Sequence, residues 1–197
     1  MTAEDEDDIA ALRRVGAVVA EAREAMLVAA QPGVSTAELD AVGREVLRRH
    51  GAQSAPRLAY GFPGSCCIGI NDRVAHGIPS STAVLRSGDL VNVDVSAELD
   101  GYWGDTGASV AVGDVAADHR RLLEATIAAQ RDAMHVARAG RPMRHIGRAV
   151  ERRARKAGLS VIAELAGHGV GRGIHEPPMV WNVEDPRNRT VLHEGLV

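Results

Sequence analysis

Two aspartates, Asp94 and Asp105, are spaced so that a hairpin could bring their carboxylates together. Apolar and polar side chains alternate over residues 90–96, which is typical of a half-buried strand. The Asp-Gly pair at 100–101 favours a two-residue hairpin turn, and in that register Ser96 faces Asp105. The two carboxylates then share one face as diagonal neighbours. Ionised carboxylates repel each other unless a cation lies between them, so the pair predicts a metal site; the alternative is a solvated polar face.

Histidines supply the other candidate donors. His168 lies in a glycine-rich segment, residues 167–173, and His175 follows seven residues later. Glycines in such a segment allow the backbone to approach a ligand closely. His76 precedes a glycine and a nearby proline, which predicts a rigid turn. The Gly-x-Gly spacing superficially resembles a phosphate cradle, but no strand–turn–helix unit surrounds it and Pro177-Pro178 follow, which argues against dinucleotide binding.

Composition limits the class of protein. The chain has 197 residues and a net charge of -3, which gives no reason to expect a nucleic-acid or membrane partner. The two cysteines, Cys66 and Cys67, are adjacent and cannot form a disulfide framework, so a reducing compartment is the simpler interpretation. The acidic N-terminus lacks the basic region and apolar run of a signal peptide. We therefore expect a cytoplasmic protein.

The elements that must position these side chains are two helix pairs separated by strands. An amphipathic helix is predicted from Asp8 to about Ala30, and a capping box at Ser35 and Glu38 begins a second helix that continues to about His50. The second pair is predicted over residues 118–139 and 143–157. Besides the carboxylate hairpin, short strands are predicted over residues 66–70, 82–85 and 161–165.

The two helix pairs indicate an internal repeat with an offset of 107 residues. The pattern V-L-x-x-G also recurs at this offset, which makes a chance match of a few glycines less credible. A repeat of this length is typical of a duplicated half-domain, so we expect a pseudo-twofold α+β fold in which each half gives two helices and then strands. The matching positions are Gly33 and Gly140, Gly51 and Gly158, and residues 84–88 and 191–195.

Four segments together resemble the type I methionine aminopeptidases. They occur in the order and spacing of that family, and the resemblance covers nearly the whole chain. It implies the pita-bread (creatinase/aminopeptidase) fold, which agrees with the repeat, and a single catalytic domain over residues 1–197. The segments are residues 71–79 (NDRVAHGIP), 91–95 (VNVDV), 101–106 (GYWGDT) and 167–177 (GHGVGRGIHEP).

The resemblance implies a metal centre. Asp94 matches a carboxylate ligand of one metal ion, Asp105 matches the carboxylate that bridges two, and His168 matches the histidine ligand. Two divalent ions, Co, Mn, Fe or Zn, are implied, and carboxylates with one imidazole suit all of them. Such a pair of ions activates water for attack on the scissile carbonyl.

The resemblance also implies the residues that handle the substrate. His175 matches a histidine that contacts the substrate near the scissile bond and stabilises the transition state. His76 matches a histidine that contacts the amine side of the substrate and assists proton transfer. Phe62, Cys67 and Ile174 match segments around the pocket for the methionine side chain. An apolar pocket of this kind accepts an unbranched, polarisable side chain.

The implied activity is hydrolysis that removes the initiator methionine from nascent proteins. The expected partner is a peptide or nascent-chain N-terminus beginning with Met, docking on the ribosome is compatible with it, and neither direct nucleic-acid nor membrane binding is expected. The full-length form is expected to be a monomer. Two alternatives stay open: a non-catalytic pita-bread module that binds peptides, which should have lost its ligands, and an X-Pro dipeptidase relative, which should carry an extra N-terminal domain.

The sequence departs from the family pattern at its end. The family supplies two further glutamate ligands after the segment that matches residues 191–197, and neither occurs here, so three of five expected protein ligands are present. The sheet would also lack its last strands, leaving an open edge. We therefore expect a C-terminally incomplete aminopeptidase with poor solubility, weak single-site metal binding and doubtful activity as it stands.

Overall fold

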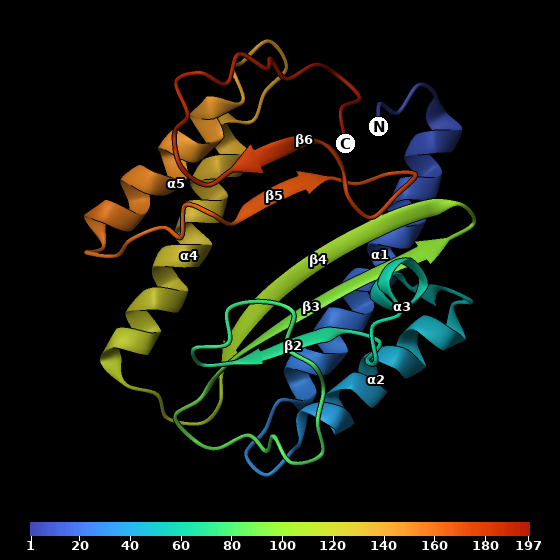
Figure 1. Ribbon diagram of the computed structural model, residues 1–197, viewed down its shortest axis with the longest axis vertical. Helices are drawn as coiled ribbons and strands as arrows, with labels where there is room; N and C mark the ends of the chain where they lie inside the picture. Colours follow the sequence, from blue (N-terminus) through green and yellow to red (C-terminus); the bar gives the residue numbers. More distant parts are fainter. The chain divides into compact units, whose positions relative to one another are not determined.

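Figure 1 shows the computed structural model of the chain, which describes all residues from 1 to 197. The residues group into two compact units. The N-terminal unit comprises Asp5–His119 and Gly171–Ile174, and the C-terminal unit comprises Met1–Glu4, Arg120–Val170 and His175–Val197. The single catalytic domain expected over the whole chain stays a prediction.

The N-terminal unit is built around one long strand, β3 (Leu90–Leu99). All other strands of its sheet pair with β3 in antiparallel orientation. The longest helix, α1 (Glu6–Ala29), packs against β3, β4 (Tyr102–Ala111) and α2 (Thr36–Arg49) (Figure 1). The remaining elements are β1 (Gln53–Ser54), α3 (Ala55–Tyr60) and β2 (Cys67–Ile70).

The core of this unit contains the apolar face of β3. Val91, Val93 and Val95 have no exposed surface, as their alternation with polar residues predicts, and they belong to one cluster with Met26 of α1. Burying a side chain of this kind contributes about 1.5–3 kcal/mol relative to leaving it exposed. Because one face of the strand is fixed in the core, Asp94 must project from the other.

Local signals place the helix ends close to their predicted positions. Asp5 caps α1, since its carboxylate accepts a hydrogen bond from the Asp8 N–H at 2.9 Å. The predicted capping box is confirmed: the Glu38 N–H donates to Ser35 Oγ at 3.3 Å, and the Ser35 N–H donates to the Glu38 carboxylate at 2.8 Å. Both bonds satisfy N–H groups that the first turn of a helix leaves unpaired.

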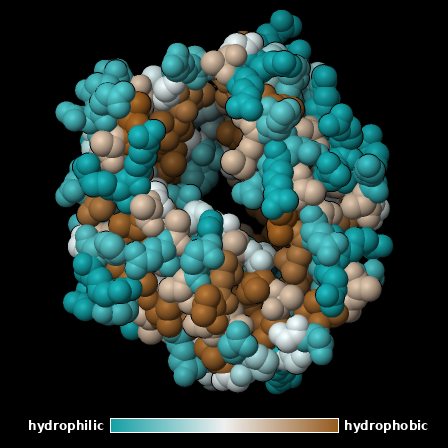
Figure 2. All heavy atoms as spheres, turned by 180° about the vertical axis from the view of Figure 1, so that it is seen from behind, coloured by the Kyte–Doolittle hydropathy of each residue, from teal (hydrophilic) through white to brown (hydrophobic).

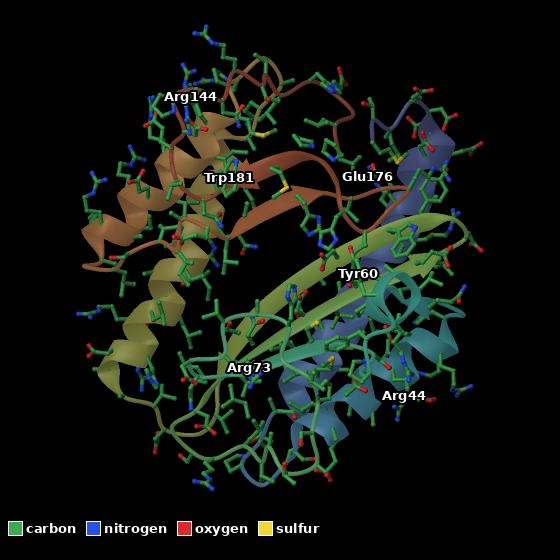
Figure 3. The ribbon with its side chains drawn as sticks, viewed as in Figure 1. Arg44, Tyr60, Arg73, Arg144, Glu176 and Trp181 are labelled. Atoms are coloured by element: carbon green, nitrogen blue, oxygen red, sulfur yellow. The ribbon has the colours of Figure 1, made fainter.

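The C-terminal unit contains two helices and a two-stranded antiparallel sheet. The helices are α4 (Ala117–Val136), which belongs to this unit from Arg120 onward, and α5 (Arg144–Lys156). The strands are β5 (Ala166–Gly169) and β6 (Glu176–Trp181). Figure 3 labels Glu176 and Trp181, the two end residues of β6. Gly147 allows α5 to pack closely on β6, because a Cβ there would lie 2.8 Å from the Trp181 carbonyl oxygen and 2.1 Å from that of Val183, just beyond the strand.

Hydrogen bonds inside each unit confirm the repeat. In the N-terminal unit the segment after α1 pairs with residues 83–85, and in the C-terminal unit the segment after α4 pairs with residues 190–192 in the same pattern. The equivalent N–H to carbonyl bonds are Gly33 to Leu85 (2.9 Å) and Gly140 to Leu192 (2.8 Å), Leu85 to Val34 (2.9 Å) and Leu192 to Arg141 (2.9 Å), and Thr36 to Ala83 (2.9 Å) and Met143 to Thr190 (2.9 Å).

Several strand predictions are wrong. Residues 82–85 form only an isolated bridge from Val84 to Ser35, because the segment is too short and turn-rich to extend the ladder. The strand predicted over residues 161–165 lies instead at β5, whose two glycines have low strand propensity. The short elements β1 and α3 and the proline-containing β6 are not predicted at all. Strand β6 begins with Glu176 and includes the Pro177-Pro178 pair.

The surface is mixed in character. Hydrophilic side chains cover much of the face shown in Figure 2, with hydrophobic atoms exposed between them. None of the helices combines the length and the apolar composition needed to cross a membrane. Apolar atoms exposed in this way are normal on protein surfaces and do not by themselves indicate a binding site.

Candidate active site

The carboxylate hairpin has the predicted register. Asp105 lies opposite Ser96, and Asp94 lies opposite Gly107, so the two aspartates are diagonal neighbours on one face of β3 and β4. Both turn residues, 100 and 101, have positive φ values of +54° and +81°. Such values are required at both central positions of a type I′ turn. The Asp-Gly turn therefore sets the register that brings the two half-buried carboxylates together.

Cys67 lies beside these carboxylates. It is the direct partner of Asp94 in the β2–β3 ladder and its exposed fraction is only 8%. Burial, followed by the charges of Asp94 and Asp105, raises the pKa of the Cys67 thiol to about 12. Burial likewise raises the pKa of Cys66. The effect of both carboxylates on the Cys67 thiol agrees with a shared face. Burial, the largest cause for both cysteines, keeps both thiols neutral and therefore unreactive.

The thiols make the free energy of unfolding fall at alkaline pH. An unfolded thiol has a pKa of roughly 8.5, well below that of folded Cys67. Between these values the unfolded chain binds fewer protons, so stability decreases as pH rises, by up to about 1.4 kcal/mol per pH unit for each thiol. Urea unfolding at neutral and alkaline pH measures the effect. A Cys67→Ala variant is expected to lose stability less steeply with pH, and an unchanged slope would contradict the buried neutral thiol.

His168 and His175 lie together in the C-terminal unit. The ring centroids of His168 and His175 are 4.2 Å apart, with an interplanar angle of 62°. His168 lies on β5 rather than in a loop, and a bulge follows it at Gly169. His168 Nδ1 lies 3.0 Å from the Gly169 carbonyl oxygen. A carbonyl can only accept, so Nδ1 carries the hydrogen and Nε2 becomes the nitrogen suited to a metal, which is the usual arrangement of a histidine ligand.

His76 occupies the predicted tight turn. It is exposed and has a φ of +50°, which is uncommon for a residue with a side chain. The next residue, Gly77, runs against β2: its carbonyl accepts from the Ile68 N–H at 2.9 Å, and a Cβ on Gly77 would lie 1.9 Å from the Ile68 carbonyl oxygen. Only glycine fits that approach, so the turn holding His76 is fixed to the sheet.

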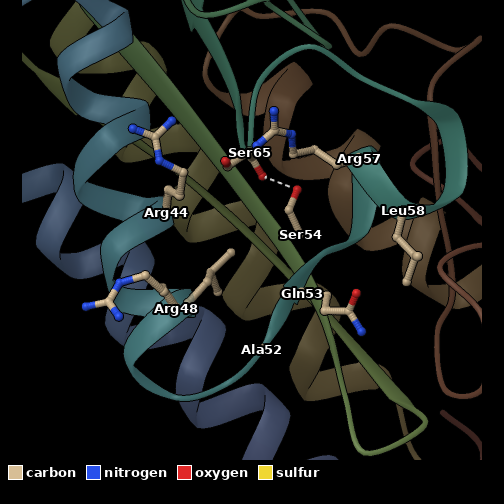
Figure 4. Close-up of a pocket in the computed structure, with 9 residues that line it drawn as sticks. Arg44, Arg48, Ala52, Gln53, Ser54, Arg57, Leu58 and Ser65 are labelled. Carbon is tan, nitrogen blue, oxygen red and sulfur yellow. Dashed lines mark hydrogen bonds between the residues drawn. The ribbon is translucent and has the colours of Figure 1, made fainter.

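The three predicted pocket residues all belong to the N-terminal unit. Phe62 is half-buried just after α3, Cys67 is buried on β2, and Ile174 is 8% exposed in the segment Gly171–Ile174. A separate cavity of about 390 Å³ lies among α2, β1 and α3 (Figure 4). Three arginines and none of the predicted site residues line this cavity. The cavity therefore gives no support to the predicted metal and substrate site.

The donor types fit a divalent metal ion, although the structure does not assemble a full ligand set. Two carboxylates lie side by side and an imidazole has its Nδ1 hydrogen engaged by a carbonyl, which is the donor chemistry expected for Mn, Fe, Co or Zn. No group of three or more His, Cys, Asp and Glu side chains is arranged to hold a metal ion. The assignment of Asp94, Asp105 and His168 as ligands therefore stays a prediction.

Comparisons with known proteins identify the family. Residues 10–197 match metallopeptidase family M24. The chain is 43% identical over 198 residues to methionine aminopeptidase 2 of Bacillus subtilis (strain 168), covering all of this chain and 80% of that protein. A methionine aminopeptidase of Staphylococcus epidermidis (strain ATCC 12228 / FDA PCI 1200) is 42% identical, with coverage of 100% and 79%.

Solved structures give the same result. The crystal structure of methionine aminopeptidase from Rickettsia prowazekii superimposes with a TM-score of 0.93 at 36% identity, covering all of this chain and 79% of that one. An X-Pro aminopeptidase from Thermotoga maritima shares the fold, with a TM-score of 0.79 at 22% identity. This match covers 99% of the present chain and 52% of the X-Pro aminopeptidase. The predicted α+β pita-bread fold is confirmed. The chain therefore belongs to the methionine aminopeptidases of metallopeptidase family M24, a family of hydrolases.

Proposed function

We propose that this protein removes the N-terminal methionine from peptides and nascent chains by metal-dependent hydrolysis, in the cytoplasm. The observation that carries the proposal is the pair Asp94 and Asp105 on one face of a hairpin, in a chain 43% identical to a methionine aminopeptidase. Two ionised carboxylates on one face repel each other, and a bound cation would offset that repulsion.

Asp94, Asp105 and His168 are the proposed ligands of divalent metal ions, two in the complete centre, with Co, Mn, Fe and Zn all suited to these donors. Bound ions would lower the pKa of water and polarise the scissile carbonyl. The protein contributes a fixed register to the carboxylates and a fixed tautomer to the imidazole, since the Gly169 carbonyl accepts the Nδ1 hydrogen. Both features reduce the reorganisation that ligand binding would otherwise require.

The remaining site residues are proposed to bind and orient the substrate. His175 would donate a hydrogen bond to the oxyanion that develops on the scissile carbonyl. His76, held in its turn by Gly77, would contact the amine side of the peptide and move a proton there. The wall of the pocket for the methionine side chain would be formed by Phe62, Cys67 and Ile174. All three are uncharged and buried or half-buried, as the wall of an apolar pocket requires.

Peptide hydrolysis tests the proposal. Met-Ala-Ser, N-acetylated Met-Ala-Ser and Ala-Pro are incubated with the protein and Mn or Co, with and without EDTA. The 197-residue chain is assayed beside a form extended in frame past Val197. Metal-dependent release of methionine from the free peptide alone is expected in at least the extended form. Cleavage of Ala-Pro would favour the X-Pro dipeptidase alternative, and binding of Met-Ala-Ser without turnover in either form would favour a peptide-binding module.

A further inference from the structure

A cluster of three side chains joins distant parts of the N-terminal unit. We call Asp8, Tyr102 and Arg172 the arginine latch. Arg172 Nη2 donates to the Tyr102 hydroxyl at 2.5 Å and to Asp8 Oδ1 at 3.1 Å, and the Tyr102 hydroxyl donates to the same Asp8 oxygen at 2.7 Å. The latch thus connects the first turn of α1, the start of β4 and the glycine-rich segment, which are far apart in sequence.

The contacts of the latch are of a kind that fixes orientation as well as distance. The Arg172 guanidinium carbon lies 3.6 Å from the centroid of the Tyr102 ring, so the planar group stacks on the ring while it binds the carboxylate. The Asp8 side chain is only 14% exposed, so its hydrogen bonds are partly shielded from water. Hydrogen bonding to Asp8 raises the pKa of the Tyr102 hydroxyl, which keeps it available as a donor.

Backbone contacts extend the latch to the segment that carries Arg172. The Trp103 N–H donates to the Gly171 carbonyl at 2.8 Å, and Arg172 Nη1 donates to the Gly101 carbonyl at 3.4 Å. The segment Gly171–Ile174 therefore belongs, by its contacts, to the N-terminal unit. In sequence it stands between His168 and His175, and only two residues separate Arg172 from His175.

We propose that Arg172 is a positioning residue whose stacking on Tyr102 and ion pair with Asp8 fix the backbone segment that immediately precedes His175 in the chain. A segment with glycines at 171 and 173 has little conformational restraint of its own. The Arg172 side chain, which lies between those two glycines in sequence, supplies the conformational restraint. The restraint on the backbone is inferred from the contacts of Arg172 alone, whereas its effect on catalysis rests on the proposed function of His175.

The first test measures the segment directly and needs no activity. Amide hydrogen exchange over residues 167–175 and the imidazole NMR signals of His175 are recorded in wild type and in Arg172→Ala. We expect exchange at residues 171–175 to become about tenfold faster or more, because the local opening is no longer restrained. We also expect the His175 signals to broaden or shift, while those of His193 stay unchanged. Arg155→Ala removes an arginine–carboxylate pair of similar length, with Glu151 at 3.2 Å, that is more exposed and lies in the other unit, and it serves as the control.

The second test separates positioning from simple stabilisation. In the form that releases methionine, Arg172→Ala is expected to lower kcat by about 10²-fold at a temperature where the variant is fully folded, because displacement of a catalytic group by about 1 Å has effects of that size. KM should change little. Arg172→Lys keeps the charge but loses the planar stack, and Tyr102→Phe keeps the ring but loses the hydroxyl, so both should fall between wild type and Arg172→Ala.

The outcomes are distinct. Unchanged amide exchange and unchanged His175 signals in Arg172→Ala would overturn the proposal, as would a variant that unfolds more easily yet keeps wild-type kcat. If no form of the wild-type protein releases methionine, the proposed function fails, while faster exchange at residues 171–175 and altered His175 signals in Arg172→Ala would still support the latch.

Discussion

Replacement of Asp105 by asparagine is expected to lower kcat/KM for methionine release from Met-Ala-Ser by more than about 100-fold. Loss of a group that merely supports a metal ligand costs about 10–100-fold in affinity or activity, so loss of a proposed ligand should cost more. A factor of 100 corresponds to about 2.7 kcal/mol of transition-state stabilisation. The change also removes one of two charges that share the face of the hairpin. Metal affinity, measured by titration, is expected to fall with activity.

The hairpin itself offers a matched control. Asp100→Asn makes the same chemical change five residues away, at a turn position with φ of +54° that asparagine tolerates well. This variant is expected to keep wild-type activity and metal affinity. If Asp105→Asn behaves like Asp100→Asn, the shared face of the carboxylates has no metal role and the solvated-hairpin interpretation holds.

Replacement of His175 by alanine is expected to lower kcat by about 10²–10³-fold and to leave KM nearly unchanged. This is the size of effect seen when one donor to a developing oxyanion is removed. We expect kcat to fall while KM stays nearly unchanged because such a donor strengthens its hydrogen bond mainly in the transition state. Ground-state binding of the peptide therefore changes little. The measurement is steady-state hydrolysis of Met-Ala-Ser at saturating metal, in the form that releases methionine.

His193→Ala is the control for this change. His193 also lies in the C-terminal unit and its Nδ1 contacts a neighbouring carbonyl, that of Glu194 at 2.9 Å, but it has no proposed role. Its removal should leave kcat unchanged. A His175→Ala variant whose KM rises while kcat stays at the wild-type value would assign His175 to peptide binding alone.

The local rules of the sequence predict much of the N-terminal unit. Alternation over residues 90–96 and the Asp-Gly turn are sufficient to fix the register of β3 and β4, because one face must be buried and the turn type sets the pairing. The repeat is predictable for a similar reason. Glycines with positive φ end the equivalent helices, at Gly51 (+71°) and Gly158 (+69°), so the same backbone requirement selects the same residue twice.

The parts that the sequence does not predict depend on contacts between distant residues. Strand β5 has two glycines among four residues, and only its pairing with β6 makes it a strand. The arginine latch also cannot be predicted from the sequence. No spacing rule connects Asp8, Tyr102 and Arg172, and nothing in the sequence distinguishes any of them from other polar surface residues. The proposed metal ligands come from the resemblance to the family, since neither periodicity nor turn chemistry connects Asp94 with His168.

A titration of metal-free protein with Co²⁺, followed by proton NMR, tests whether the carboxylate hairpin and His168 contribute to one metal centre, as we propose. We expect a paramagnetically shifted imidazole N–H signal from His168, whose Nδ1 hydrogen is held by the Gly169 carbonyl. That signal should vanish in His168→Ala and require more Co²⁺ in Asp94→Asn. Cobalt binding with no shifted imidazole signal, or binding that is unaffected by Asp94→Asn and Asp105→Asn, would contradict the proposal.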